Sequence, residues 1–485
     1  ALFFAALATG DPAKAADALA KVKAAQGDNE VAGNLEGLYK LAMIDMAGAR
    51  AVFADLVKKY PEFGPARVNL SRVLGMMGKP DEGEKLLADL LAKQPTSDPA
   101  LTMLVGMYVQ SGRLPLATTL LEKAVASEPG NLRNKVSLGD AYIRQGSAQK
   151  ALDLALKEKG PLATANEMLS MRAAAYLALG QKKEAQATYA DIIKNDPNVL
   201  GARRQLAALQ IEAGDFEAAR NTIQAGIALA PRNYQLYQDY ALIDLRATGV
   251  DAALATADRL ISQDREFDSL KALRGDLYLA SNRPADAANA FQEGFKSAKT
   301  GMMVNRLAGA LLPTGRVDDA VALLRDWVKA NPEDVVAQEQ IAEIFIATNK
   351  LDDAAAALEG ILRAKPYEAV PLNNLAWVYQ QKGDKRAADL ARQAYVLAPG
   401  AQTADTLGWI LTTTGKPENG VALLRQAFKE AASDPRIQYH FAVALKDTGS
   451  KDEAIKHLRD VASSRGEFPE KAEAQKLLDE IAKGS

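Results

Sequence analysis

The residue types that most often perform chemistry are scarce in this chain. It contains 2 histidines and no cysteine, which excludes thiolate chemistry and disulfide bonds. His440 and His457 fall on different predicted helices, so a histidine-based metal site or catalytic triad has few groups to use. We expect both histidines to occupy exposed or half-buried helix positions.

Sequence motifs for catalysis or cofactor binding are also missing. The chain has no GxxxxGK[ST] phosphate loop, no GxSxG nucleophile elbow and no HExxH zinc motif. Acidic pairs such as Asp318-Asp319 stand where a helix is predicted to begin, and there they favour the positive end of the helix dipole. The sequence therefore predicts no catalytic residue, no metal site and no cofactor.

Composition narrows the possible partners. Lys plus Arg number 59 and Asp plus Glu number 61, a near-balance that argues against nucleic acid as a partner. No apolar run reaches the length of about 18 residues that crosses a membrane, so we expect no membrane span. With 485 residues the chain exceeds the size of one ordinary globular core, and the question is how it is divided.

An internal repeat answers that question. The stretch from Leu372 to Phe428 holds two variants of one pattern, in which Gly383 of the first copy recurs as Gly415 of the second and Pro399 separates the copies. Each copy reads as a helix, a turn, a second helix and a proline stop. One such unit cannot bury its apolar face alone, so neighbouring units must stack on it.

The same unit extends along the whole chain. Most helix-stopping prolines lie about 34 residues apart, which is the tetratricopeptide period. They are Pro61, Pro95, Pro129, Pro161, Pro197, Pro231, Pro332, Pro366, Pro399 and Pro435. Turn glycines or asparagines mark the middle of most units, at Gly78, Gly112, Gly146, Gly180, Gly214, Asn282, Gly315, Asn349, Gly383, Gly415 and Gly449. The pattern is weakest between Gly146 and Pro161, and the prolines lapse between Pro231 and Pro332.

Each unit carries small residues where its two helices must touch. The first helix reads large, small, large, as in Leu138-Gly139 followed by Tyr142, and the second carries alanine before large residues. These positions share one helical face. We predict an all-α fold, a right-handed α-solenoid (superhelix) of about thirteen helix-turn-helix repeats. It covers residues 1–466, and an amphipathic capping helix covers residues 467–485.

The opening ALFFAALATG has two interpretations. It is either a remnant of a secretory signal peptide or the end of a first helix, and the second interpretation aligns Gly10-Asp11 with Gly383-Asp384. We favour the helix, so the first repeat is expected to be truncated. On that interpretation a signal or lipid anchor either lies upstream of the sequence or is missing.

These repeats resemble the tetratricopeptide-repeat (TPR) family over essentially the whole chain. The last third, with NNLAWVYQQKGD, DTLGWILTTTGKPENGVALLRQAF and IQYHFAVALKDTGSKDEAIKHL, is similar to the TPR lipoproteins of PEP-CTERM/exosortase and exopolysaccharide systems. That resemblance implies a periplasmic or outer-membrane-associated protein, with the cytoplasm as the alternative. The lipoprotein cysteine of that family is missing from this sequence.

In the TPR family, the first helix of each repeat lines a concave groove. Carried over to this chain, the most distinctive groove positions are Asn373, Trp377, Gln380, Asp405, Trp409 and Tyr439. Weaker candidates are Arg133, Asp140, Arg204, Asn305 and Glu343. Exposed aromatic rings beside amides suit a ligand site, but the two tryptophans could equally fill the contact between successive helices. The Asn373-Asn374 pair echoes TPR proteins that capture a terminal carboxylate, although no lysine accompanies it here.

Three functions compete. The first is a non-enzymatic scaffold that binds protein or peptide partners in the groove of an envelope export or exopolysaccharide secretion system. The second is direct carbohydrate binding, with polysaccharide in the same groove. The third is an accessory domain of a larger enzyme.

Overall fold

The protein is all-α. A computed structural model describes residues 2–8, 12–43, 45–77, 79–111, 113–464, 468 and 470–483. It is 81% helical, and the described residues form no strand, which confirms the predicted α-solenoid. The chain divides into a middle unit, Gly130–Ala357, and a terminal unit, which combines Ala1–Pro129 with Leu358–Ser485.

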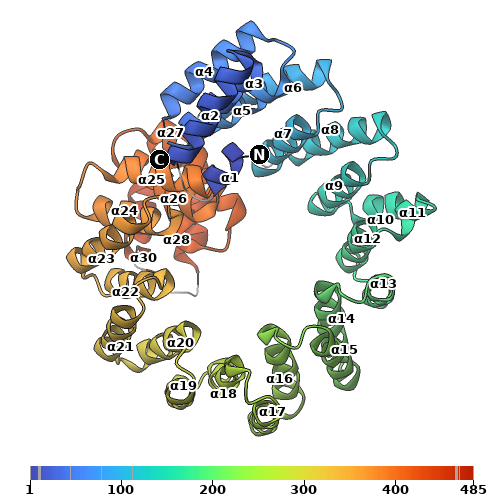
Figure 1. The fold of residues 1–485 in the computed structure, drawn as a ribbon, viewed down its shortest axis with the longest axis vertical. Coiled ribbons are helices and arrows are strands. Elements are labelled where there is room, and N and C mark those ends of the chain that lie inside the picture. The colour runs from blue at the N-terminus through green and yellow to red at the C-terminus, as the bar shows by residue number, and fades with distance from the viewer. Residues whose placement is uncertain are drawn as a thin grey trace. The chain divides into compact units, whose positions relative to one another are not determined.

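The middle unit is a run of antiparallel helix pairs, drawn from teal to yellow in Figure 1. Its helices are α9 Leu132–Arg144, α10 Ala148–Lys157, α11 Pro161–Thr164, α12 Asn166–Ala178, α13 Lys182–Asn195, α14 Leu200–Glu212, α15 Phe216–Leu229, α16 Tyr234–Thr248, α17 Val250–Gln263, η1 Asp268–Ala272, α18 Leu273–Ala280, α19 Pro284–Ser297, α20 Gly301–Leu311, η2 Leu312–Thr314, α21 Val317–Ala330 and α22 Val335–Ala347. The next helix, α23 Leu351–Ala364, crosses the division between the units.

The terminal unit repeats the same pairing in two chain segments. The first contains α1 Leu2–Ala8, α2 Pro12–Gln26, α3 Glu30–Ala42, α4 Met46–Lys59, α5 Gly64–Met76, α6 Pro80–Lys93, α7 Asp98–Gln110 and α8 Leu114–Ser127. The second contains α24 Ala369–Gln381, α25 Ala387–Leu397, α26 Ala401–Thr413, α27 Pro417–Glu430, α28 Pro435–Asp447, α29 Lys451–Ala462 and α30 Lys471–Lys483. Within this unit α5 contacts α25 and α7 contacts α27.

The turns occur where the glycines and asparagines predicted them. Gly146 has φ of 77°, and Asn282 takes the same left-handed conformation with φ of 57°. A left-handed residue ends a helix without strain when it is glycine, and asparagine is the next best choice. Pro80 and Pro284 stand in the first turn of α6 and α19, where a proline needs no backbone N–H. The predicted turn residues Gly78 and Gly112 lie outside the described residues.

Small residues let the two helices of a repeat approach each other. A Cβ atom added to Gly275 of α18 would lie 2.3 Å from the Phe291 ring of α19, so the ring occupies the space that a side chain would need. Gly37 of α3 and Phe53 of α4 repeat this contact, at 2.4 Å and at the same interval along the chain. Phe53 and Phe291 are fully buried, which stabilises each pair by about 1.5–3 kcal/mol.

The two irregular stretches are those where the sequence pattern weakened. After Gly146 the second helix of its repeat, α10, is only 10 residues long, and the extra turn α11 follows it. Between Pro231 and Pro332 the first helix of one repeat begins as the 3₁₀-helix η1 before it continues as α18. At the chain end, α30 buries Ala474 and Ile481 against Leu458, as a capping helix should. The predicted boundary at 466/467 lies outside the described residues.

Candidate functional site

Consecutive first helices are joined by polar pairs that recur at a fixed spacing. In four cases the partners are 35 residues apart, about one repeat length plus one position. The pairs are Asn69 Nδ2 to Asn34 Oδ1, Arg204 Nε to Asp239 Oδ2, Gln340 Nε2 to the Asn305 carbonyl and His440 Nδ1 with Asp405 Oδ1. The groove positions predicted from the sequence did not include Asp239 or His440, but this 35-residue spacing from Arg204 and Asp405 points to both.

On α26 and α28 the structure brings three predicted site residues together around a histidine. Asp405 and His440 are 4% and 3% exposed, and their side chains are hydrogen-bonded at 2.8 Å. The Trp409 ring stacks on the His440 ring with centroids 4.1 Å apart and planes 15° apart. Tyr439 is buried, with its ring centroid 6.0 Å from that of Trp409. Asp405 and Tyr439 therefore face the packed interior, and one face of Trp409 is covered.

The prediction that both histidines are exposed or half-buried was wrong. His440 and His457 are buried, not exposed or half-buried. His440 is held by the Asp405 carboxylate, and His457 lies 3.3 Å from Gln438 Nε2 and packs against the Phe428 ring. Both histidines thus serve the packing of neighbouring repeats, as polar groups whose hydrogen bonds are satisfied inside it.

The other half of the predicted aromatic site lies on α24. Trp377, Asn373 and Gln380 are all half-buried. The Asn373 Oδ1 atom is buried and accepts no hydrogen bond from the described residues. Among those residues no ring contact joins Trp377 to Trp409. Trp377 and Trp409 are both half-buried, but only the Trp409 ring is stacked on another ring among the described residues.

The weaker candidates have separate surroundings. Arg133 and Asp140 are exposed on α9, and Glu343 is exposed on α22. Asn305 of α20 has a buried side-chain oxygen without a partner among the described residues, while its backbone carbonyl accepts from Gln340. Arg204 is the candidate that opens onto a hollow.

That hollow lies between α14 and α16 in the middle unit and has a volume of about 520 Å³. Arg204, Ala208 and Ile211 of α14 line it, and of these Arg204 was predicted as a groove residue. Arg204 crosses to α16, where its Nε lies 2.5 Å and its Nη2 3.2 Å from the Asp239 carboxylate. Arg246 of α16 lines the same space. We call this space the α14–α16 hollow.

Charges in the hollow are distributed unevenly. Arg204 is paired with Asp239, and Glu212 accepts from Lys182 Nζ at 2.7 Å. Arg246 is exposed and takes part in no ion pair within the described part of the chain. The hollow therefore offers one uncompensated guanidinium beside an apolar floor of alanine and isoleucine.

A buried carboxylate continues the polar row along α16, α18 and α20. Asp276 accepts from Tyr234 Oη at 2.5 Å and from Gln238 Nε2 at 2.7 Å, and Arg306 makes a short ion pair with it. Burial raises the pKa of Tyr234 to about 12, so its hydroxyl stays a donor at neutral pH. The Arg306 guanidinium also lies over the Tyr234 ring at 5.0 Å. This network stiffens three successive first helices beside the hollow.

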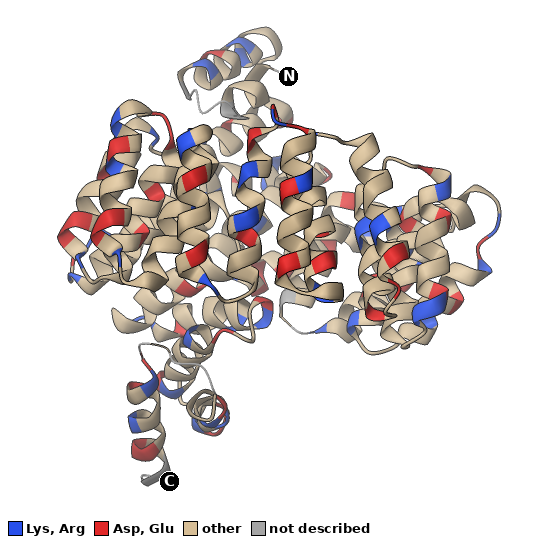
Figure 2. Cartoon of the chain, turned by 90° about the horizontal axis from the view of Figure 1, so that it is seen from below, with Lys and Arg blue, Asp and Glu red and all other residues tan. Residues whose placement is uncertain are grey.

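Other kinds of site are not seen in the described residues. They contain no cluster of three or more histidines and carboxylates that could hold a metal ion. No helix among them is long and apolar enough to span a membrane. Figure 2 shows basic and acidic residue positions interspersed along the same helices, in keeping with the nearly balanced charge.

Family models match both units of the chain. Models described as tetratricopeptide repeat match residues 167–198, 200–225, 272–335, 305–369 and 399–474. The model of the Psidin N-terminal TPR repeats region matches residues 47–158. No protein with curated annotation matches the sequence.

Solved structures of repeat proteins also align with the chain. The APC/C hetero-tetramer Cut9-Hcn1 contains a chain 15% identical, with 99% of this chain and 95% of that chain covered and a TM-score of 0.43. Naa15/Naa10 bound to HypK-THB aligns at 13% identity over 99% and 76%, with a TM-score of 0.38. A tetratricopeptide repeat protein from Parabacteroides merdae is 19% identical over 53% of this chain and 98% of its own, with a TM-score of 0.32.

Proposed function

Since the chain is built from tetratricopeptide repeats, we propose that it is a non-enzymatic scaffold that holds segments of protein partners against its first helices. The α14–α16 hollow is the observation that carries this proposal. It is formed by first-helix positions, it is large enough for several side chains, and it presents one guanidinium without a carboxylate partner among the described residues.

The occupant that fits this hollow is an extended peptide with an acidic side chain. The apolar floor at Ala208 and Ile211 would accept a small aliphatic group, and the Arg246 guanidinium would bind a carboxylate. Arg204 and Asp239 are already paired with each other, so they form the border of the site and fix its shape. A peptide of mixed character also suits the balanced charge of the whole chain.

Site-specific photo-crosslinking tests the proposal. A photoreactive residue at Ala208, which is exposed inside the hollow, should capture one or a few polypeptides from the source cells. The same residue at Ala187, exposed on α13 outside the hollow, should not capture them. An additional Arg246→Glu substitution should abolish capture at Ala208 because it replaces the attracting charge by a repelling one.

Arg265→Glu is the matched control, since Arg265 is an exposed arginine of the same unit that does not line the hollow. It should leave capture at Ala208 unchanged. Capture that is equal at Ala187 and Ala208, or that persists in Arg246→Glu, would argue against this surface as the binding site.

The cellular setting is a further part of the proposal. The resemblance of the last third of the chain to TPR lipoproteins supports a periplasmic or outer-membrane-associated place in an export or exopolysaccharide system. Fractionation of the source cells tests it, with recovery in the cytoplasmic fraction as the opposing result. Carbohydrate as the ligand would appear as crosslinking to material that resists protease.

A further inference from the structure

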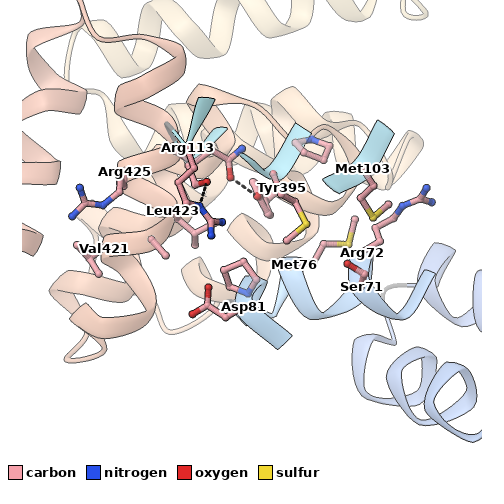
Figure 3. A pocket seen from close by; sticks show the side chains of 17 residues that line it. Ser71, Arg72, Met76, Asp81, Met103, Arg113, Tyr395, Val421, Leu423 and Arg425 are labelled. Atoms are coloured by element: carbon pink, nitrogen blue, oxygen red, sulfur yellow. Dashed lines mark hydrogen bonds between the residues drawn. The ribbon is translucent and has the colours of Figure 1, made fainter. Parts of the chain in front are cut away.

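A second cavity lies in the terminal unit, whereas the α14–α16 hollow lies in the middle unit. It has a volume of about 420 Å³ and lies between α5, α6 and α7 on one side and α25 and α27 on the other (Figure 3). The thioethers of Met76, Met103 and Met107 line one side, and Leu423 and Tyr395 line the other. Methionine side chains are flexible and polarisable, so they adapt to an apolar guest of varied shape.

The polar groups of this cavity are concentrated in a few side chains. Tyr395 is buried and donates its hydroxyl to Gln426 Oε1 at 2.8 Å, and burial raises its pKa to about 12. Arg113 donates to Ser111 Oγ at 2.7 Å and to both carboxylate oxygens of Glu84. An apolar lining with a few polar groups is the usual character of a small-molecule site.

Positive charge exceeds negative charge around the cavity. Arg113 is compensated by Glu84 and Arg425 by Glu453, in two bidentate pairs. Asp81 adds a carboxylate at the exposed edge.

Two further cations have no such compensation. Arg72 lines the cavity, whereas Lys429 is not a lining residue and stands one helical turn after the lining residue Arg425 on α27. Neither makes an ion pair among the described residues. The pKa of Lys429 is lowered, first by burial and then by the charges of Arg425 and Arg113. An anion held near Lys429 would relieve this repulsion.

We propose that this cavity binds a small amphipathic carboxylate, with its apolar chain among Met76, Met103 and Met107 and its carboxylate at the basic edge formed by Arg113 and Arg425, one helical turn before Lys429. The site is independent of the proposed scaffold function, because it lies in the other unit. Its walls come from residues 71–113 and 395–426, so an occupant joins two segments that are far apart in the sequence. Bound ligand should therefore protect both segments together from hydrogen exchange.

The probe is decanoate, added to the full chain labelled with ¹³C at its methionine methyl groups. Three of the 10 methionines line the cavity, and the other seven serve as internal controls. The Met76, Met103 and Met107 signals should shift and saturate, while the others stay in place. Similar shifts of all methionines would overturn the proposal, since they indicate nonspecific association.

Two glycine substitutions distinguish an effect of filling the cavity from an effect on folding. Gly75 of α5 lines the cavity, and a Cβ atom there meets nothing within 4 Å. Gly75→Leu should fill the space and weaken decanoate binding by at least about tenfold. Gly106 of α7 is equally open but does not line the cavity, so Gly106→Leu should bind like the wild type. Unchanged binding in Gly75→Leu would refute the site.

The charge requirement is tested with matched head groups. Decanoate should bind more tightly than decanol, and decyltrimethylammonium should bind least. Lys429→Gln should weaken the binding of decanoate by roughly fivefold and leave the binding of decanol unaffected, as expected for the loss of one partly screened charge. Equal affinity of decanol and decanoate would contradict the assignment to an anion.

Discussion

Gly408 of α26 and Gly420 of α27 face each other so closely that neither has room for a side chain. A Cβ atom on Gly408 would lie 2.7 Å from Leu424 Cγ and 3.1 Å from the Gly420 carbonyl oxygen. A Cβ atom on Gly420 would lie 2.6 Å from the Gly408 carbonyl oxygen. Backbone atoms cannot move aside as a flexible side chain can. The contact places Gly408 at the crossing of the two helices of its own repeat.

Gly408→Leu should therefore destabilise the protein by about 1–3 kcal/mol through overpacking. Denaturant unfolding of the variant and the wild type measures the difference. Gly106→Ala is the control, because its Cβ atom meets nothing within 4 Å and alanine is the better helix former. An unchanged midpoint in Gly408→Leu would mean that the assigned helix crossing is wrong.

The two tryptophans should respond differently to removal. Trp409 stacks on His440 and packs beside Tyr439, whereas Trp377 makes no ring contact among the described residues. We expect Trp409→Ala to cost about 2–4 kcal/mol of unfolding free energy, and Trp377→Ala clearly less.

Partner affinity separates packing from binding at these positions. If Trp377 belongs to a ligand site, Trp377→Ala should weaken binding by roughly 2 kcal/mol while the thermal midpoint changes little. The opposite result is a lowered thermal midpoint in both variants together with normal partner affinity of the folded fraction. It would show that the tryptophans only pack between helices and do not bind a partner.

The Asp276 network should behave as a unit. Asp276→Ala leaves the Arg306 guanidinium and the Tyr234 hydroxyl without their shared acceptor, which should cost about 3 kcal/mol. In a double-mutant cycle with Arg306→Ala, the two losses should not add. If the losses of unfolding free energy of the two single variants add up to that of the double variant, the ion pair contributes little to stability.

Stability should depend on pH through His457. Burial lowers the pKa of this imidazole, and the nearby Glu453 and Asp460 carboxylates oppose the shift only in part. The unfolded chain takes up the proton near its ordinary value of about 6.5, before the folded protein does. The contribution of His457 to the free energy of unfolding is therefore complete above that pH. It is lost as the pH falls below that value, by at most about 1.4 kcal/mol per pH unit.

The measurement is the unfolding free energy of the wild type and His457→Gln between neutral and mildly acidic pH. The wild type should lose more stability on acidification, because glutamine carries no titrating group. Parallel pH profiles for the two proteins would contradict the assignment to His457.

The sequence by itself determined the repeat unit. Turn residues such as Gly146 and Asn282, the first-turn prolines and the spacing of small and large residues act within about one unit of chain, through backbone sterics and helix periodicity. The same local rules indicated the weak repeat between Gly146 and Pro161, where α10 is short and α11 follows, but they did not predict the 3₁₀-helix η1.

Tertiary structure decided which first-helix residues meet. Asp405 was expected in a groove with Trp409, yet it is buried against His440, because the stacking offset between repeats brings residues 35 positions apart into contact. The cavity of the terminal unit was beyond prediction for a related reason. Its walls, near Met76 and Tyr395, come from distant segments, and their approach depends on the packing accumulated over many repeats rather than on local sequence.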